Sequence, residues 1–173
     1  HNPDDYIVER IEFKSHDGRL VPLTITRHKK TKLDGSANLL LYGYGSYGNS
    51  MSPVFSSTRL SLIDRNIIWA TAHIRGGMEK GMKWWKEGKL TNKKNTFEDY
   101  IHAAKYLIDN KYSSKGKIIG MGGSAGGLLM GAVVNQAPKL FLGIIMAVPF
   151  VDSLTTNLDH SLPLTVGEFD EFG

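Results

Sequence analysis

A serine lies at the centre of a glycine-rich run whose pattern is typical of a nucleophile. Residues 122–127 read Gly-Gly-Ser-Ala-Gly-Gly, so Ser124 occupies the middle of Gly-x-Ser-x-Gly. The apolar residues 118–121 predict a buried strand before it, and residues 128–134 predict a helix after it. In that setting a sharp turn pushes the serine side chain outward, and the glycines leave room for the turn. The Ser124 hydroxyl would then be placed to attack a carbonyl carbon.

The same turn predicts a place for negative charge. The helix is expected to begin at Ser124, so free backbone N–H groups and the positive end of the helix dipole point at a bound group. The N–H of Ala125 can donate to the oxyanion that forms when a hydroxyl adds to a carbonyl. In the alternative interpretation, the pattern arises by chance and the small residues only let the helix pack closely on the strand. The strand and the helix around the motif favour the nucleophile.

The remaining segments predict the sheet that must position this turn. Residues 6–14 and 20–28 alternate between apolar and polar side chains, and an Asp-Gly turn lies between them. This pattern predicts an antiparallel hairpin. Further strands are predicted at residues 39–42, 67–73, 118–121 and 142–148. Helices are predicted between them, at residues 55–65, 97–109 and 128–134. This order predicts an α/β fold with a mostly parallel sheet, an antiparallel start and helices on both faces.

Two finer expectations follow from the chain order. The spacing Thr96-x-x-Asp99 predicts a capping box that opens the helix over residues 97–109. Glycine-rich stretches follow three of the predicted strands, at residues 43–48, 76–77 and 122–127. Because the carboxyl ends of parallel strands share one rim of a sheet, these stretches are expected to meet there. Residues 149–173 are predicted to be loop-rich and become acidic toward their end.

Composition limits the classes of protein. The chain has 173 residues, of which 41% are hydrophobic and 22% charged, as in a globular domain. The formal net charge is +4, but the basic residues are dispersed, so neither nucleic acid nor a membrane is predicted as a partner. The chain has no cysteine, which excludes a thiol nucleophile. Neither a metal nor another cofactor is expected, since no histidines have metal-ligand spacing with a third ligand.

Several motifs in the same order resemble the prolyl oligopeptidase family of serine peptidases. They are the loop over residues 41–48 (LYGYGSYG), the run at 75–79, Lys-Asn-Thr-Phe at 94–97 and the glycine-rich run around Ser124. The ending, with Val-Pro-Phe-Val-Asp and then Thr-Val-Gly-Glu-Phe-Asp-Glu at 165–171, resembles the oligopeptidase B branch. The resemblance covers essentially the whole chain and implies part of an α/β-hydrolase fold, spanning residues 1–173 of a catalytic domain.

The resemblance implies a cytoplasmic serine peptidase that cleaves short peptides after Arg or Lys. Ser124 matches the nucleophile, and the N–H of Ala125 and the hydroxyl of Tyr44 match the two oxyanion donors. Glu168 and Asp170 match two acids that bind the basic side chain before the scissile bond. A pair of carboxylates suits a guanidinium because it accepts paired N–H bonds. An ordinary exposed acidic loop is the alternative for these two residues.

The sequence also departs from the family pattern. Ser52 and Val54 replace two acids that follow the tyrosine loop, and Met78 replaces a glycine. Hydrolase triads run Ser, acid, His along the chain, yet His160 is the only histidine after Ser124, and it lies in a segment that the family uses otherwise. The family's triad Asp and His and its β-propeller are therefore expected outside these residues.

The sequence is compatible with two functions. In the first, the chain is the nucleophile-bearing part of an oligopeptidase, is inactive alone, and works with a complementary C-terminal polypeptide. In the second, it is a truncated non-catalytic remnant or an interaction piece, with an open sheet edge as its docking surface.

Overall fold

The fold is built on one mixed β-sheet. The structure, a computed structural model, describes residues 1–52 and 54–173. Within these residues the sheet has six strands in the order β1-β2-β4-β3-β5-β6. The bounds are Tyr6–Lys14 (β1), Leu20–His28 (β2), Leu39–Tyr42 (β3), Ile68–Ala72 (β4), Ile118–Gly123 (β5) and Phe141–Ala147 (β6). β1, β2 and β4 pair antiparallel, and β4, β3, β5 and β6 pair parallel. The predicted fold class is confirmed.

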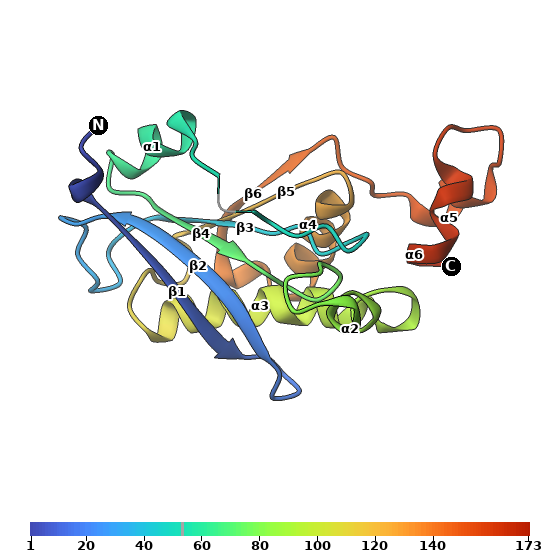
Figure 1. The fold of residues 1–173 in the computed structure, drawn as a ribbon, viewed down its shortest axis with the longest axis horizontal. Coiled ribbons are helices and arrows are strands. Elements are labelled where there is room, and N and C mark those ends of the chain that lie inside the picture. Colours follow the sequence, from blue (N-terminus) through green and yellow to red (C-terminus); the bar gives the residue numbers. More distant parts are fainter. Residues whose placement is uncertain (53) are drawn as a thin grey trace.

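Helices cover both faces of the sheet. Their bounds are Ser57–Ile63 (α1), Met82–Lys86 (α2), Lys94–Asp109 (α3), Ala125–Gln136 (α4), Ser153–Leu158 (α5) and Phe169–Phe172 (α6). Short 3₁₀ turns lie at Pro3–Asp5, Leu90–Asn92, Pro138–Leu140 and Thr165–Gly167. α1 packs on β4 and β2, whereas α3 and α4 pack on each other and α4 also covers β5 and β6. Figure 1 shows α1 on one side of the sheet and α3 on the other.

This two-sided arrangement follows from the direction of the crossovers. The chain moves from β3 to β4 in one direction along the sheet, and from β4 to β5 and then β6 in the other. Right-handed crossovers place helices on opposite faces when the direction reverses. The central strands are therefore buried on both sides, and Leu39, Leu41, Ile68 and Ile118 are fully buried.

The sequence predictions differ from the structure at two places. α3 begins at Lys94, so Thr96 and Asp99 lie inside the helix and the predicted capping box is wrong. The Thr96 hydroxyl instead donates to the carbonyl oxygens of Arg75 and Gly88, at 2.9 and 3.1 Å. Residues 149–173 are less loop-rich than predicted, because they contain α5 and α6. Each of these helices is too short to produce a helical period in the sequence.

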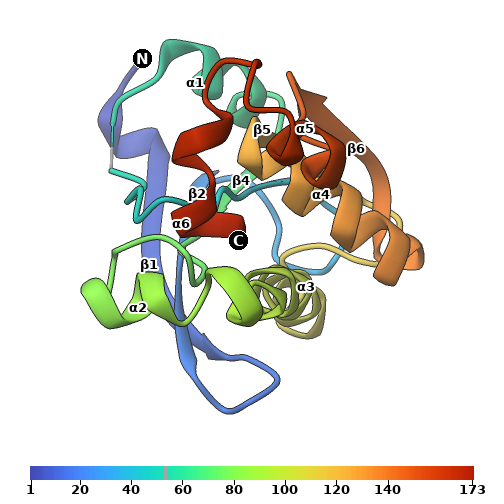
Figure 2. The ribbon, with the colours of Figure 1, turned by 90° about the vertical axis from the view of Figure 1, so that its right-hand side faces the viewer.

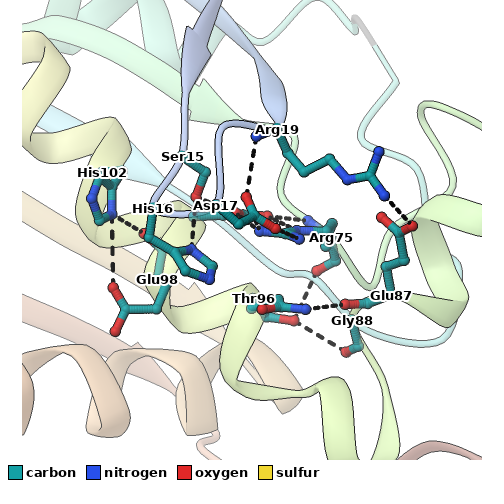
Figure 3. Close-up of polar contacts among 12 residues, drawn as sticks. Ser15, His16, Asp17, Arg19, Arg75, Glu87, Gly88, Thr96, Glu98 and His102 are labelled. Atoms are coloured by element: carbon teal, nitrogen blue, oxygen red, sulfur yellow. Dashed lines mark hydrogen bonds and ion pairs between the residues drawn. The ribbon is translucent and has the colours of Figure 1, made fainter.

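A buried ion cluster ties the β1–β2 turn and the end of β4 to α3 (Figure 3). Arg75 follows β4 and is 1% exposed. Its Nε and Nη2 donate to the carboxylate of Asp99 at 2.8 and 2.6 Å, and its Nη1 donates to Asp17 at 2.6 Å. Burial alone would lower the pKa of Arg75, but its hydrogen bonds to the two carboxylates outweigh that effect and raise the pKa. The guanidinium therefore stays charged, and it fixes the loop after β4.

This cluster supports a second loop, which begins after β3. Gly76 lies against that loop, since a Cβ on Gly76 would be 2.0 Å from the carbonyl oxygen of Gly45. The N–H of Gly48 also donates to the carbonyl of Gly76 at 2.9 Å. Two of the three glycine-rich stretches therefore meet at one rim of the sheet, as the sequence predicted.

We predict that Asp99→Asn lowers the free energy of unfolding by about 3–5 kcal/mol, because it leaves the charged Arg75 buried beside a neutral partner. Asp109→Asn, at the exposed end of the same helix, is the matched control and should change stability by about 0.5 kcal/mol or less. Urea denaturation of both variants measures the difference. Equal stability of the two variants would contradict the role given to the cluster.

Candidate active site

Ser124 lies on a strained turn between β5 and α4. Its backbone has φ 55° and ψ −119°, a conformation with positive φ that a residue with a side chain rarely adopts. The side chain is exposed, whereas Ala125 and Gly126 immediately after it are buried. The turn is pinned on both sides, because the N–H of Ser124 donates to Ala147 at 2.9 Å and its carbonyl accepts from Phe150 at 3.0 Å. The strand, strained turn and helix that the motif predicts are all present.

Close backbone contact makes this turn possible. A Cβ on Gly122 would lie 2.2 Å from the carbonyl oxygen of Gly126, a distance that no side chain can occupy. A Cβ on Gly126 would lie 3.0 Å from the carbonyl oxygen of Gly43, at the end of β3. The glycines thus let the third glycine-rich stretch reach the same rim as the other two. The first N–H groups of a helix have no acceptor one turn earlier, so the N–H of Ala125, at the start of α4, is a candidate donor at this turn.

Tyr44 stands next to Ser124, on the loop after β3. The Tyr44 side chain is partly buried. Burial raises the pKa of its phenol, and the Ser124 hydroxyl opposes this shift. A Cβ on Gly126 would lie 3.3 Å from Cδ2 of Tyr44, so the Tyr44 ring lies against the start of α4. Since the phenol stays protonated at neutral pH, it can donate a hydrogen bond toward negative charge that develops near Ser124. The structure therefore brings together the three residues that the sequence proposed for the nucleophile and the oxyanion donors.

The loop that carries Tyr44 is held by a buried lysine that the sequence did not identify. Nζ of Lys93 donates to the carbonyl of Gly45 and to Oγ of Ser46, both at 2.6 Å. It also pairs with Oε1 of Glu171 at 3.2 Å. Burial lowers the pKa of Lys93, and the carboxylate of Glu171 opposes that shift. Glu171 is 1% exposed and also accepts from the indole of Trp85 at 2.8 Å. These contacts link the Tyr44 loop to α6.

The last part of the chain forms one wall of a cavity beside Ser124. Figures 1 and 2 show α5 and α6 in red, beyond the carboxyl ends of the strands. The cavity has a volume of about 230 Å³, and the residues that line it include Tyr47, Ser124, Phe150, Asn157, Thr165 and Glu168. Oε2 of Glu168 accepts from the Tyr47 hydroxyl at 2.6 Å. A carboxylate and a candidate nucleophile therefore share one small cavity.

Comparison with known proteins identifies the family. The sequence pattern of the group described as "Prolyl oligopeptidase family" matches residues 53–173. The chain belongs to the prolyl oligopeptidase family. It is 50% identical over 169 residues to dipeptidyl aminopeptidase BI of Pseudoxanthomonas mexicana, covering 97% of this chain and 23% of that protein. It is also 50% identical over 165 residues to protease 2 of Moraxella lacunata, covering 95% of this chain and 24% of that protein.

Solved structures of relatives have the same fold. Oligopeptidase B from Leishmania major is 46% identical, with a TM-score of 0.96, and the match covers 99% of this chain and 24% of that one. Oligopeptidase B from Trypanosoma brucei is 41% identical, also with a TM-score of 0.96, and the match covers 100% of this chain and 24% of that one. The chain therefore spans about a quarter of the length of the relatives that it matches.

Asp170, the second of the two acids predicted to bind a basic side chain, does not lie with Glu168, the first. Asp170 is exposed and is not among the residues that line the cavity with Glu168. Its neighbour Glu171 is the buried acid of this helix. The Glu171 carboxylate pairs with Lys93 and accepts a hydrogen bond from Trp85. The two carboxylates that the sequence paired are thus not brought together in one cavity. The sequence offered no signal that Glu171 rather than Asp170 faces inward, because the helix is a single turn.

The histidines lie away from Ser124. His160 is exposed and its ring stacks edge-on with Phe169, with the ring centroids 5.7 Å apart. His73 is buried at the end of β4, where its ring contacts Thr24 and Glu79. No histidine lines the cavity among the residues that the structure describes. In residues 1–52 and 54–173, no group of three or more His, Asp or Glu residues could hold a metal ion, and no helix is long and apolar enough to cross a bilayer.

We predict that Gly122→Ala destabilises the chain by about 1–3 kcal/mol, because the new methyl group collides with the carbonyl of Gly126. Gly143→Ala is the matched control, since a Cβ at Gly143 in β6 meets nothing within 4 Å. That control should be neutral or more stable by about 0.4–1 kcal/mol. Thermal or urea unfolding of the two variants checks the difference, and equal effects would show that the turn is not tightly packed.

Proposed function

We propose that this chain is the nucleophile-bearing part of a serine-type oligopeptidase that hydrolyses short peptides after Arg or Lys. The single observation that carries the proposal is the cavity in which Ser124 and Glu168 meet. A carboxylate in that position suits a cationic side chain on the acyl side of the bond that Ser124 attacks. The oligopeptidase B names of the similar structures support short peptides as the substrates. A cytoplasmic location, which the resemblance implies, remains a prediction.

The chemistry follows from the geometry at the turn. Oγ of Ser124 adds to the carbonyl carbon of the scissile bond while a general base removes the hydroxyl proton. The negative charge moves to the carbonyl oxygen, where the N–H of Ala125 and the hydroxyl of Tyr44 donate hydrogen bonds. The intermediate then expels the amine, which takes up the proton, and leaves an acyl group on Ser124. Water hydrolyses that ester and regenerates the serine. The T. brucei relative carries covalently bound antipain, which is consistent with covalent chemistry in this group.

The general base must come from outside residues 1–173 in this proposal. His160 is turned towards Phe169, and the described residues place no histidine at the cavity. A serine without its base is a weak nucleophile, and loss of a triad member costs orders of magnitude in rate. The proposed partner is therefore a polypeptide segment that supplies the family's Asp and His, on the same chain or on a separate one.

An exposed sheet edge supports a second candidate, in which the chain serves mainly as an interaction piece. β6 is the last strand of the described sheet. It carries the exposed apolar residues Leu142, Ile145 and Met146, which are 59%, 42% and 37% exposed. An unpaired edge of this kind is a template for another strand. The same edge also suits the complementary segment of the first proposal, so the two candidates differ in catalysis and not in docking.

We predict that residues 1–173 alone hydrolyse an arginine ester at least about 10⁴-fold more slowly than the full polypeptide that carries them. Initial rates of both proteins, each compared with its Ser124→Ala variant, provide the measurement. Turnover by residues 1–173 at the full rate, abolished by Ser124→Ala, would refute the need for an external base. An inactive full polypeptide would instead favour the non-catalytic candidate.

We also predict that Glu168→Ala in the full polypeptide lowers kcat/KM for cleavage after Arg by roughly 10- to 100-fold, which is the loss expected for a hydrogen-bonded charge pair. Cleavage after a neutral residue should change much less. Glu98→Ala, on the outer side of α3, is the control and should affect neither substrate. Equal losses on the basic and neutral substrates would count against the assignment of Glu168.

A further inference from the structure

A buried hydrogen-bond acceptor without a partner lies beside Ser124. Asn157 belongs to α5, is 5% exposed and lines the cavity that contains Ser124 and Glu168. Within residues 1–52 and 54–173, its Oδ1 is buried and has no hydrogen-bonding partner. Buried side-chain oxygens are almost always paired, because an unpaired one loses its water without compensation. This oxygen therefore lacks a donor, and the residue that carries it borders the cavity.

Glu168 provides the second acceptor of the same cavity. Its Oε2 is engaged by the Tyr47 hydroxyl, at 2.6 Å. Burial and this contact raise the pKa of Tyr47, so the phenol remains a donor and holds the carboxylate in place. A carboxylate has about four lone-pair sites, so the other sites of Glu168 remain for a ligand. The residues that line the cavity thus include one carboxylate and one side-chain amide, and Asp170 is not among them.

We propose that Asn157 is a specificity-determining residue whose Oδ1 accepts a hydrogen bond from an arginine guanidinium held by Glu168. This inference rests on the proposed function, because it assumes that a basic side chain occupies the cavity. A guanidinium has five N–H donors in a rigid planar fork, so it can reach two acceptors on separate elements at once. An ammonium is a compact charge that Glu168 can satisfy alone. Asn157 therefore favours arginine over lysine.

The substitutions Asn157→Met and Asn157→Asp give opposite expectations. Met removes the acceptor and puts an unbranched, flexible side chain in its place, whereas Asp replaces the neutral acceptor with a charged one. Asn157→Met should weaken binding of an arginine ligand, and Asn157→Asp should strengthen it. A gain with Asp that is larger for an arginine ligand than for a lysine ligand would not follow from a purely structural role, because a new charge alone attracts both cations. The control is Asn135→Met, on the exposed side of α4, which should have no effect on binding.

The experiment is calorimetric titration of the full polypeptide that carries residues 1–173. The probes are the Nα-acetyl amides of arginine, lysine and norleucine, the last of which has no side-chain donor. We expect Asn157→Met to weaken binding of the arginine probe by about tenfold, binding of the lysine probe by about twofold and binding of the norleucine probe not at all. We expect Asn157→Asp to tighten binding of the arginine probe by about tenfold.

Glu168→Gln separates failure of this inference from failure of the proposed function. If Glu168→Gln removes the preference for arginine over norleucine while both Asn157 variants keep the wild-type affinities, the proposed function stands and the role of Asn157 is overturned. Equal weakening of all three probes by both Asn157 variants also overturns it, since that result indicates a structural role. If the wild type does not prefer arginine over norleucine, the proposed function fails as well.

Discussion

The contact between Gly122 and Gly126 is the constraint on which the rest of the site depends. A Cβ on Gly122 would lie only 2.2 Å from the carbonyl oxygen of Gly126, so β5 can turn directly into α4 only where side chains are absent. That turn forces Ser124 to a positive φ of 55° and leaves its side chain exposed. Backbone strain of this kind costs on the order of 1–3 kcal/mol, and it persists because the hydrogen bonds to Ala147 and Phe150 hold both sides of the turn.

The position of Tyr44, the proposed side-chain oxyanion donor, depends on packing that lies further from Ser124. Tyr44 is positioned by a loop that rests on the backbone of Gly76 and is held by Lys93. The Gly76 loop in turn depends on the charged pair of Arg75 and Asp99, which is fully buried. Breaking such a pair leaves an uncompensated charge in the interior. The site is therefore sensitive to residues that never approach a substrate.

The sequence predicted the elements whose signals are local. The alternation in residues 6–14 and 20–28, the apolar strands and the Gly-x-Ser-x-Gly turn all follow from neighbouring residues, and the structure confirms them. The capping box failed because Thr96 and Asp99 are engaged by Arg75, which is distant in the sequence. The inward position of Glu171 and the orphaned oxygen of Asn157 also depend on tertiary contacts. No period or spacing in a single-turn helix could indicate which of Asp170 and Glu171 is buried.

The most direct test of the central claim is to map the adduct of a fluorophosphonate probe on the full polypeptide that carries these residues. The account predicts one adduct, on the peptide that contains Ser124, and no adduct in the Ser124→Ala variant. An exposed serine on a strained turn, beside the proposed oxyanion donors, is the nucleophile expected to attack the phosphorus of such a probe and displace fluoride. Labelling that persists in Ser124→Ala, or that maps to another serine, would contradict the account.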